Sequence, residues 1–254
     1  LGDFLQQVAL VAETDNLADR ERARLIEMIA LWYTEAGKYH VLPLDSRGTM
    51  RFADPRPQIS TVRNSYTYYP GTQVVPENAA VKVLNTAHAI TADVELAAGD
   101  EGVVFSHGSN VGGYTLFVAD GKLHYVHNYV GAQELHVASE QVIDTGRHTL
   151  RYEFEPSGAP DVRNGKGTPG RGRLLIDGTV VGEAQFAVTI PLAIGIGGGA
   201  VVGRNPGSPI TDRYTPPYAF TGTIHQVTVS TATAESHDED EAKRAEARVA
   251  MARQ

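Results

Sequence analysis

Histidine side chains are the first candidates for chemistry in this chain, which has nine histidines and no cysteine. Imidazole nitrogens bind zinc when several of them converge on one point. His124 and His127 stand three residues apart in a stretch with strand-like alternation, so we expect them on opposite faces of the strand. No His-x-His or His-Glu-x-x-His spacing occurs, and His107, beside the glycine-rich stretch 108–113, is the only histidine expected at a rim. The spacing therefore predicts no histidine metal site.

Carboxylates are the second candidates. Glu153 and Glu155 alternate onto one face of an expected strand and could form the acid pair of a hydrolase, but a solvated strand face with this spacing is far commoner. Asp100, Asp120 and Asp212 lie in expected loops, where carboxylate and backbone oxygens can hold calcium. None of the three belongs to a calcium loop with ligands at fixed spacing. A structural calcium ion therefore stays open as an alternative.

The glycine-rich segment Gly195–Ala200 has the composition of a dinucleotide-binding loop. Such a loop works where a strand turns into a helix whose N-terminus meets the pyrophosphate. Val201 and Val202 instead continue as a strand, and no helical pattern follows them. The segment is therefore interpreted as a loop without a cofactor.

Composition limits the classes of partner. The chain has 254 residues and a net charge of −8, whereas nucleic-acid binding needs a clustered basic face. No run approaches the roughly 18 apolar residues of a membrane span. The lack of cysteine excludes disulfides and thiolate nucleophiles, and it leaves a soluble protein equally suited to the bacterial cytoplasm or to export.

The N-terminal region predicts a strand and a helix. Residues 6–11 form a short apolar run, Asp15 or Asn16 fits a helix N-cap, and Gly37 fits a C-terminal stop. Between the cap and the stop runs an apolar stripe with helical spacing. The stripe consists of Leu25, Met28, Ile29, Trp32 and Ala36. This helix needs a partner surface to bury Trp32.

The rest of the chain predicts a bridge and a β domain. Residues 41–76 lose all periodicity and are rich in proline and tyrosine, which is typical of a packed bridging segment. Asp120-Gly121 and Asp177-Gly178 each stand between alternating hydrophobic residues and predict two-residue hairpins with positive φ. Short strands with regular turns predict a mainly β fold, an antiparallel two-sheet jelly-roll sandwich.

Eight segments resemble, in order, the C-terminal part of actinobacterial-type arylsulfatases of the sulfatase family. They are Glu13–Ala18, Leu31–Asp45, Tyr68–Thr72, Val75–Glu77, Gly112–Tyr114, Asp120–Leu123, Ile176–Gly178 and Thr215–Ile224. They are spread along residues 13 to 230, and their collinear order is more specific than any one motif. The chain departs from the family at Leu5-Gln6-Gln7, where Leu-Tyr-Asp is usual.

The resemblance implies a domain plan. Residues 1–40 would be the C-terminal end of a sulfatase α/β domain, and residues 41–76 the bridging segment. Residues 77–232 would form a ConA-like, laminin-G-like sandwich, and residues 233–254 a charged helical tail. The chain would then be a fragment of a longer polypeptide, with the N-terminal catalytic domain or chain as its partner.

The resemblance also implies that this chain alone is inactive. Sulfatases are marked by Cys or Ser in the pattern (Cys/Ser)-x-Pro-x-Arg, whose first residue is oxidised to formylglycine. Here Gly167 stands at that position before Thr168-Pro169-Gly170-Arg171, and no other copy occurs. No catalytic, cofactor-binding or metal-binding residue is therefore assigned, and formylglycine and calcium are expected in the catalytic portion.

The expected function is that of a non-catalytic C-terminal part of a sulfuric-ester hydrolase. It would pack against the catalytic domain, form part of the wall of the active site, or hold subunits together in a homo-oligomer. Arg47, Tyr66, Tyr68 and Tyr69 are the candidates for residues that face that site, although such aromatics more often serve packing.

The alternative is an independent carbohydrate-binding, lectin-like module. Sandwiches can hold sugars on rim aromatics, and Tyr114, Tyr125 and Tyr129 are available. Tyr114 and Tyr125 lie inside strand patterns, however, where core packing is the default.

Overall fold

The computed structural model describes residues 16–46, 63–194 and 198–231. By its internal contacts the chain divides into two units, Leu1–Asp54 and Pro55–Gln254. The strand expected at 6–11 and the charged tail expected at 233–254 lie outside the described residues.

The described part of the first unit holds one helix, α2 (Arg22–Lys38). The helix begins later than the expected cap, because Asn16 accepts the backbone N–H of Ala18 at 3.0 Å and closes a separate turn. Its other end passes the expected stop at Gly37 by one residue. No helix in the described ranges is long and apolar enough to cross a membrane.

Several apolar side chains of α2 are exposed. Of the predicted stripe, only Ala36 is buried, and Trp32 and Met28 are 37% and 62% exposed. Ile26 and Leu31, beside the stripe, are also exposed. Among the described residues, 16–46 in this unit, the helix therefore lacks the cover that its apolar stripe calls for.

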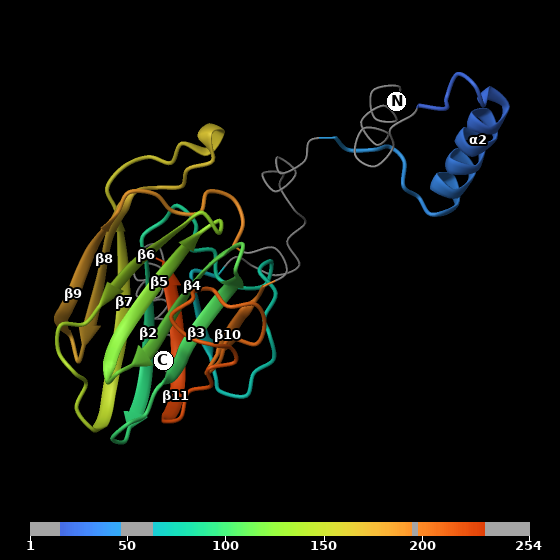
Figure 1. The fold of residues 1–254 in the computed structure, drawn as a ribbon. Helices are drawn as coiled ribbons and strands as arrows, with labels where there is room; N and C mark the ends of the chain where they lie inside the picture. The colour runs from blue at the N-terminus through green and yellow to red at the C-terminus, as the bar shows by residue number, and fades with distance from the viewer. Residues whose placement is uncertain (1–15, 47–62, 195–197, 232–254) are drawn as a thin grey trace, which may run out of the picture. The chain divides into compact units, whose positions relative to one another are not determined.

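The second unit is a sandwich of two antiparallel sheets (Figure 1), which confirms the predicted fold class. Sheet A has six strands in the order β1-β11-β2-β7-β8-β9, and sheet B has five in the order β10-β3-β4-β5-β6. The strands of sheet A are β1 (Ser65–Tyr68), β2 (His88–Leu96), β7 (Gly146–Pro156), β8 (Gly170–Ile176), β9 (Thr179–Phe186) and β11 (Thr223–Thr231). Those of sheet B are β3 (Gly102–Ser109), β4 (Gly112–Ala119), β5 (Lys122–Tyr129), β6 (Gln133–Ala138) and β10 (Ala200–Val202).

Strand β1 arises in the segment expected to lack regular structure. Its four residues pair with β11 in the register Ser65↔Ser230 to Tyr68↔Val227. This short edge strand gains its backbone hydrogen bonds from a partner more than 150 residues further along the chain, so local periodicity could not reveal it.

Both Asp-Gly hairpins form as predicted. Asp120 and Gly121 have φ of 50° and 71°, and Asp177 and Gly178 have φ of 51° and 81°. Two consecutive positive φ angles define the turn whose twist matches antiparallel strands. The first turn joins β4 to β5, and the second joins β8 to β9.

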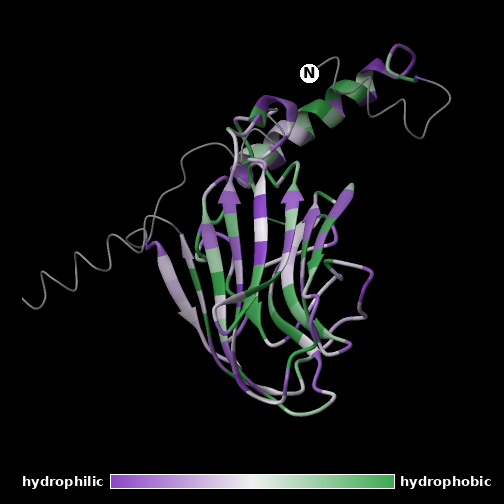
Figure 2. Ribbon diagram, turned by 90° about the vertical axis from the view of Figure 1, so that its left-hand side faces the viewer, coloured by the Kyte–Doolittle hydropathy of each residue, from purple (hydrophilic) through white to green (hydrophobic). Residues whose placement is uncertain are grey.

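The core lies between the two sheets. Hydrophobic and hydrophilic residues alternate along the strands (Figure 2), and the apolar sets of both sheets meet in one large cluster. Aromatic rings form its centre, where Tyr125 stacks on Tyr152 with ring centroids 3.4 Å apart. Phe186 lies beside both rings, at 6.1 and 6.4 Å.

Residues 203–222, named the strap here, cover the outer face of sheet B. Tyr214 of the strap packs against Val103, Phe117 and Val126 in a second buried cluster. The backbone N–H of Val103 donates to the carbonyl of Tyr218 at 2.8 Å. The strap thus buries outward-facing positions of β3, β4 and β5 that a sandwich normally leaves in water.

Candidate functional site

The tyrosines predicted to face a site have different surroundings. Tyr68 is buried in the core, where its hydroxyl accepts the backbone N–H of Val81 at 3.3 Å, and burial raises its pKa. Tyr66 is partly buried and stacks on Tyr68 at 6.3 Å. Tyr69 is 57% exposed, so it alone of the three offers its ring to a partner. Arg47 lies outside the described residues.

The three tyrosines considered for sugar stacking are not free for it. Tyr114 and Tyr125 are each 1% exposed and belong to the core. Tyr129 packs partly buried against the same core, and its hydroxyl donates to the carbonyl of Gly165 at 2.7 Å. A flat aromatic platform is therefore absent at all three positions.

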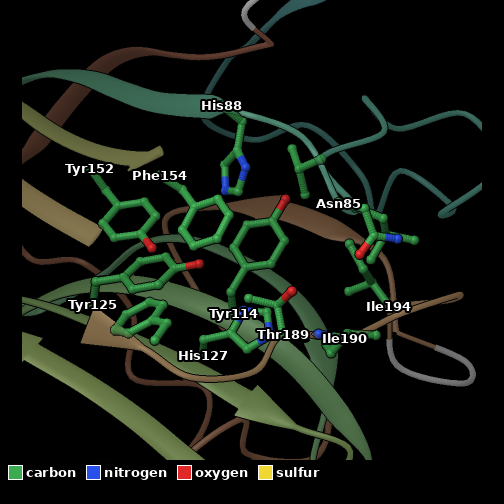
Figure 3. Close-up of a pocket in the computed structure, with 13 residues that line it drawn as sticks. Asn85, His88, Tyr114, Tyr125, His127, Tyr152, Phe154, Thr189, Ile190 and Ile194 are labelled. Carbon is green, nitrogen blue, oxygen red and sulfur yellow. Dashed lines mark hydrogen bonds between the residues drawn. The ribbon is translucent and has the colours of Figure 1, made fainter. Parts of the chain in front are cut away.

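A small cavity of about 20 Å³ lies among core residues (Figure 3). Its wall combines aromatic rings with polar groups from both sheets and from two loops. The lining residues are Val83, Leu84, Asn85, His88, Tyr114, Tyr125, His127, Tyr152, Phe154, Phe186, Thr189, Ile190 and Ile194. Pockets that take organic ligands measure about 300–1,000 Å³, so this cavity is too small for a substrate.

Three histidines in and around this core are neutral at pH 7. Burial lowers the pKa of His88 and His107 to about 4 and that of His127 to about 3. His127 accepts the backbone N–H of Ile190 at its Nε2, at 3.1 Å, so its proton sits on Nδ1. His127 faces inward and His124 outward, as their spacing predicts.

The prediction that His107 stands at a rim is wrong. The side chain is 1% exposed, and its Nδ1 lies 3.2 Å from the hydroxyl of Tyr114. The glycine-rich stretch 108–113 does not open a loop there, because β3 and β4 continue through Ser109 and Gly112 in register.

A polar groove of about 440 Å³ lies on the outer face of sheet A, next to the β8–β9 turn. It is lined by Thr91, Asp93, Arg147, His148, Thr149, Asp177, Gln226 and Thr228. Arg147 donates two hydrogen bonds to Asp93, of 2.9 and 2.5 Å. These bonds hold the pKa of the Asp93 carboxyl below its usual value. No sequence motif marks this groove, because its residues come from three separate strands (β2, β7 and β11) and a turn.

The carboxylate of Asp177, in the turn between β8 and β9, also lines the groove. It accepts the backbone N–H of Thr149 at 2.8 Å and contacts Nδ1 of His148 at 2.7 Å, and these two bonds lower its pKa. The other ring nitrogen of His148 lies 3.0 Å from the carbonyl of Asp144. The groove therefore presents firmly held polar groups that can hydrogen-bond the hydroxyls of a ligand.

Three of the other predicted carboxylates, Glu153, Glu155 and Asp100, are held by bonds within the structure. Glu153 binds Arg151 and Arg173, both at 2.8 Å, and Glu155 binds Arg171 at 2.6 Å, so neither is free to act as an acid or base. Asp100 accepts the backbone N–H of Ala97 and the hydroxyl of Thr221. Among the described residues, no three His, Cys, Asp or Glu side chains gather as metal ligands would.

Comparisons with known proteins give resemblances of fold only. No family model matches the chain, and no curated protein sequence does. A SAP-like pentraxin from Limulus polyphemus is 14% identical, with a TM-score of 0.40 over 69% of this chain and 81% of that one. The LG4-5 domains of mouse laminin α1 are 13% identical, with a TM-score of 0.40 over 68% of this chain and 40% of theirs.

A third similar structure is the CBM40 of Ruminococcus gnavus IT-sialidase, solved with α2,6-sialyllactose. It is 14% identical, with a TM-score of 0.41 over 65% of this chain and 91% of that one. Identities and TM-scores this low transfer no ligand to the present chain, and its fold class rests on its own strand order.

Proposed function

We propose that the chain is a non-catalytic module of a sulfuric-ester hydrolase of the arylsulfatase type, and that helix α2 attaches it to the catalytic α/β domain. The exposed apolar side chains of α2 carry this proposal. Ile26, Met28 and Leu31 are each more than 60% exposed on one short helix. Burying such a side chain contributes about 1.5–3 kcal/mol of favourable free energy. A protein partner that covers several of them would therefore bind this helix favourably.

The arylsulfatase-like segments support the proposal through the positions they occupy. Asp120–Leu123 and Ile176–Gly178 contain the two hairpin turns, and Tyr68–Thr72 begins at a core residue. Thr215–Ile224 forms the second half of the strap and the start of β11. Shared residues at turns, core and strap favour a shared fold, whereas no catalytic motif of the family occurs in the sequence.

Binding to a catalytic domain is the first test. The chain is co-expressed with an actinobacterial arylsulfatase α/β domain that lacks its own C-terminal part. We expect the two to co-purify, and we expect Trp32→Asp to weaken the complex at least tenfold, because it places a charge in the apolar stripe. Thr34→Asp, on the polar face of α2, is the control and should leave binding unchanged. Equal binding by all three chains, or none by the wild type, contradicts the proposal.

The same preparations test the other parts of the proposal. The purified chain alone should hydrolyse an aryl sulfate no faster than buffer, and turnover above buffer contradicts a non-catalytic role. Light scattering on the isolated chain shows whether α2 pairs with a second copy when no catalytic domain is present. In that case Trp32→Asp, but not Thr34→Asp, shifts the mass to that of a monomer.

Carbohydrate binding is a second candidate, favoured by the polar groove on sheet A. The absence of a tyrosine platform there predicts weak binding, with millimolar dissociation constants. Calorimetry with neutral mono- and disaccharides measures it, and Gln226→Ala, inside the groove, should abolish it. Gln185→Ala, an exposed glutamine of β9 outside the groove, is the matched control. Undetectable heats with every sugar at millimolar concentration rule this candidate out.

A further inference from the structure

His88 carries a hydrogen-bond acceptor that no described residue satisfies. Its Nδ1 lies 2.9 Å from the carbonyl oxygen of Thr86. A carbonyl can only accept, so Nδ1 holds the proton of the neutral ring and Nε2 is a bare acceptor. Nε2 is fully enclosed and has no partner within the described part of the chain. An enclosed acceptor of this kind needs a donor that reaches it inside the core.

Two tyrosines that line the same cavity carry hydroxyl donors. The rings of Tyr125 and Tyr152 stack with their centroids 3.4 Å apart, and each ring carries one hydroxyl. Each hydroxyl has one proton to donate. Tyr125, Tyr152 and His88 all line the same cavity (Figure 3). The donors and the acceptor therefore line one cavity without touching.

The size of the gap fits one small molecule. The ring centroids of His88 and Tyr152 are 6.1 Å apart, and the cavity that both residues line measures about 20 Å³. A buried water needs about 10–15 Å³ and two to four polar partners. We propose that this cavity is a binding site for a single water molecule, which accepts an O–H from Tyr125 or Tyr152 and donates to Nε2 of His88.

A crystal structure of the full chain at atomic resolution and pH 7.5 tests the site directly. We expect one ordered water within hydrogen-bonding distance of His88 Nε2 and of a Tyr125 or Tyr152 oxygen. A cavity without solvent density overturns the proposal, and so does a direct bond between a tyrosine hydroxyl and Nε2.

Nuclear magnetic resonance tests the same site in solution. Magnetisation transfer from a long-lived water to the Hε1 proton of His88 is expected in the wild type and in the surface control His225→Phe. The double variant Tyr125→Phe/Tyr152→Phe removes both hydroxyls and should abolish this transfer while the amide spectrum stays dispersed. If the double variant does not fold, the measurement on the wild-type chain is sufficient by itself. Absence of magnetisation transfer to His88 in the wild type contradicts a bound water.

Discussion

Acidification from pH 7 to pH 5 should lower the free energy of unfolding of the sandwich by several kcal/mol. His88, His107 and His127 have folded-state pKa values of about 4, 4 and 3, below the value near 6.5 of an unfolded chain. As the pH falls through 6.5 the unfolded chain takes up protons and the folded one does not. Each histidine then costs about 1.4 kcal/mol per pH unit until its folded pKa is reached.

The three together give a slope of about 4 kcal/mol per pH unit below pH 6, against a total domain stability of about 5–15 kcal/mol. Urea unfolding followed by circular dichroism at pH 7.5, 6 and 5 measures this slope. Replacing one buried histidine, as in His107→Phe, should reduce the slope by about 1.4 kcal/mol per unit. The exposed control His225→Gln should not change it. An unfolding free energy that stays constant from pH 7.5 to 5 would show that the three rings are not buried as neutral bases.

The variant Gly108→Ala should destabilise the sandwich by about 4 kcal/mol, because overpacking and backbone strain act together. Gly108 has a φ of 113°, which L side chains rarely adopt. A Cβ there would overlap the backbone of Gly112 and lie 2.5 Å from the Cα of Gly113. Neither neighbour is a side chain that could turn away, so the strands β3 and β4 themselves would have to move apart.

Gly178→Ala is the matched control, because its φ of 81° brings similar strain but no atom lies within 4 Å of the new Cβ. We expect a loss of about 1 kcal/mol for the control. In thermal melts a domain of this size loses about 2–4 °C per kcal/mol, so Gly108→Ala should melt about 10 °C lower than the wild type. Equal melting temperatures for the two variants would mean that the close contact between β3 and β4 is not needed.

The sequence predicts those parts of this fold that depend on neighbours along the chain. The two Asp-Gly turns follow from the φ requirements of adjacent residues, and the two-sheet class follows from strand length and alternation. Alternation also puts His124 and His127 on opposite faces of β5, as in the structure. These predictions needed no knowledge of which strands pair.

The features that the sequence did not reveal depend on contacts between distant residues. A turn residue such as Asp177 predicts a hairpin, but its bonds to Thr149 and His148 come from β7. The segment Gly195–Ala200 shows the same limit. Glycine is required at Gly198 because a Cβ would overlap the backbone of Gly108, and this approach between separate segments leaves only a glycine-rich composition in the sequence.

The covering of sheet B by the strap makes the sandwich one-sided. An ordinary two-sheet sandwich offers two broad faces to its surroundings, and either can meet another protein. Here the exterior of sheet B is occupied by the chain's own residues, with Asn128 donating to the carbonyl of Ile210 at 2.8 Å. A flat partner, whether protein or glycan, can therefore contact only sheet A or the loops at the ends of the sandwich. In a larger assembly the sandwich would always turn the same side toward such a partner.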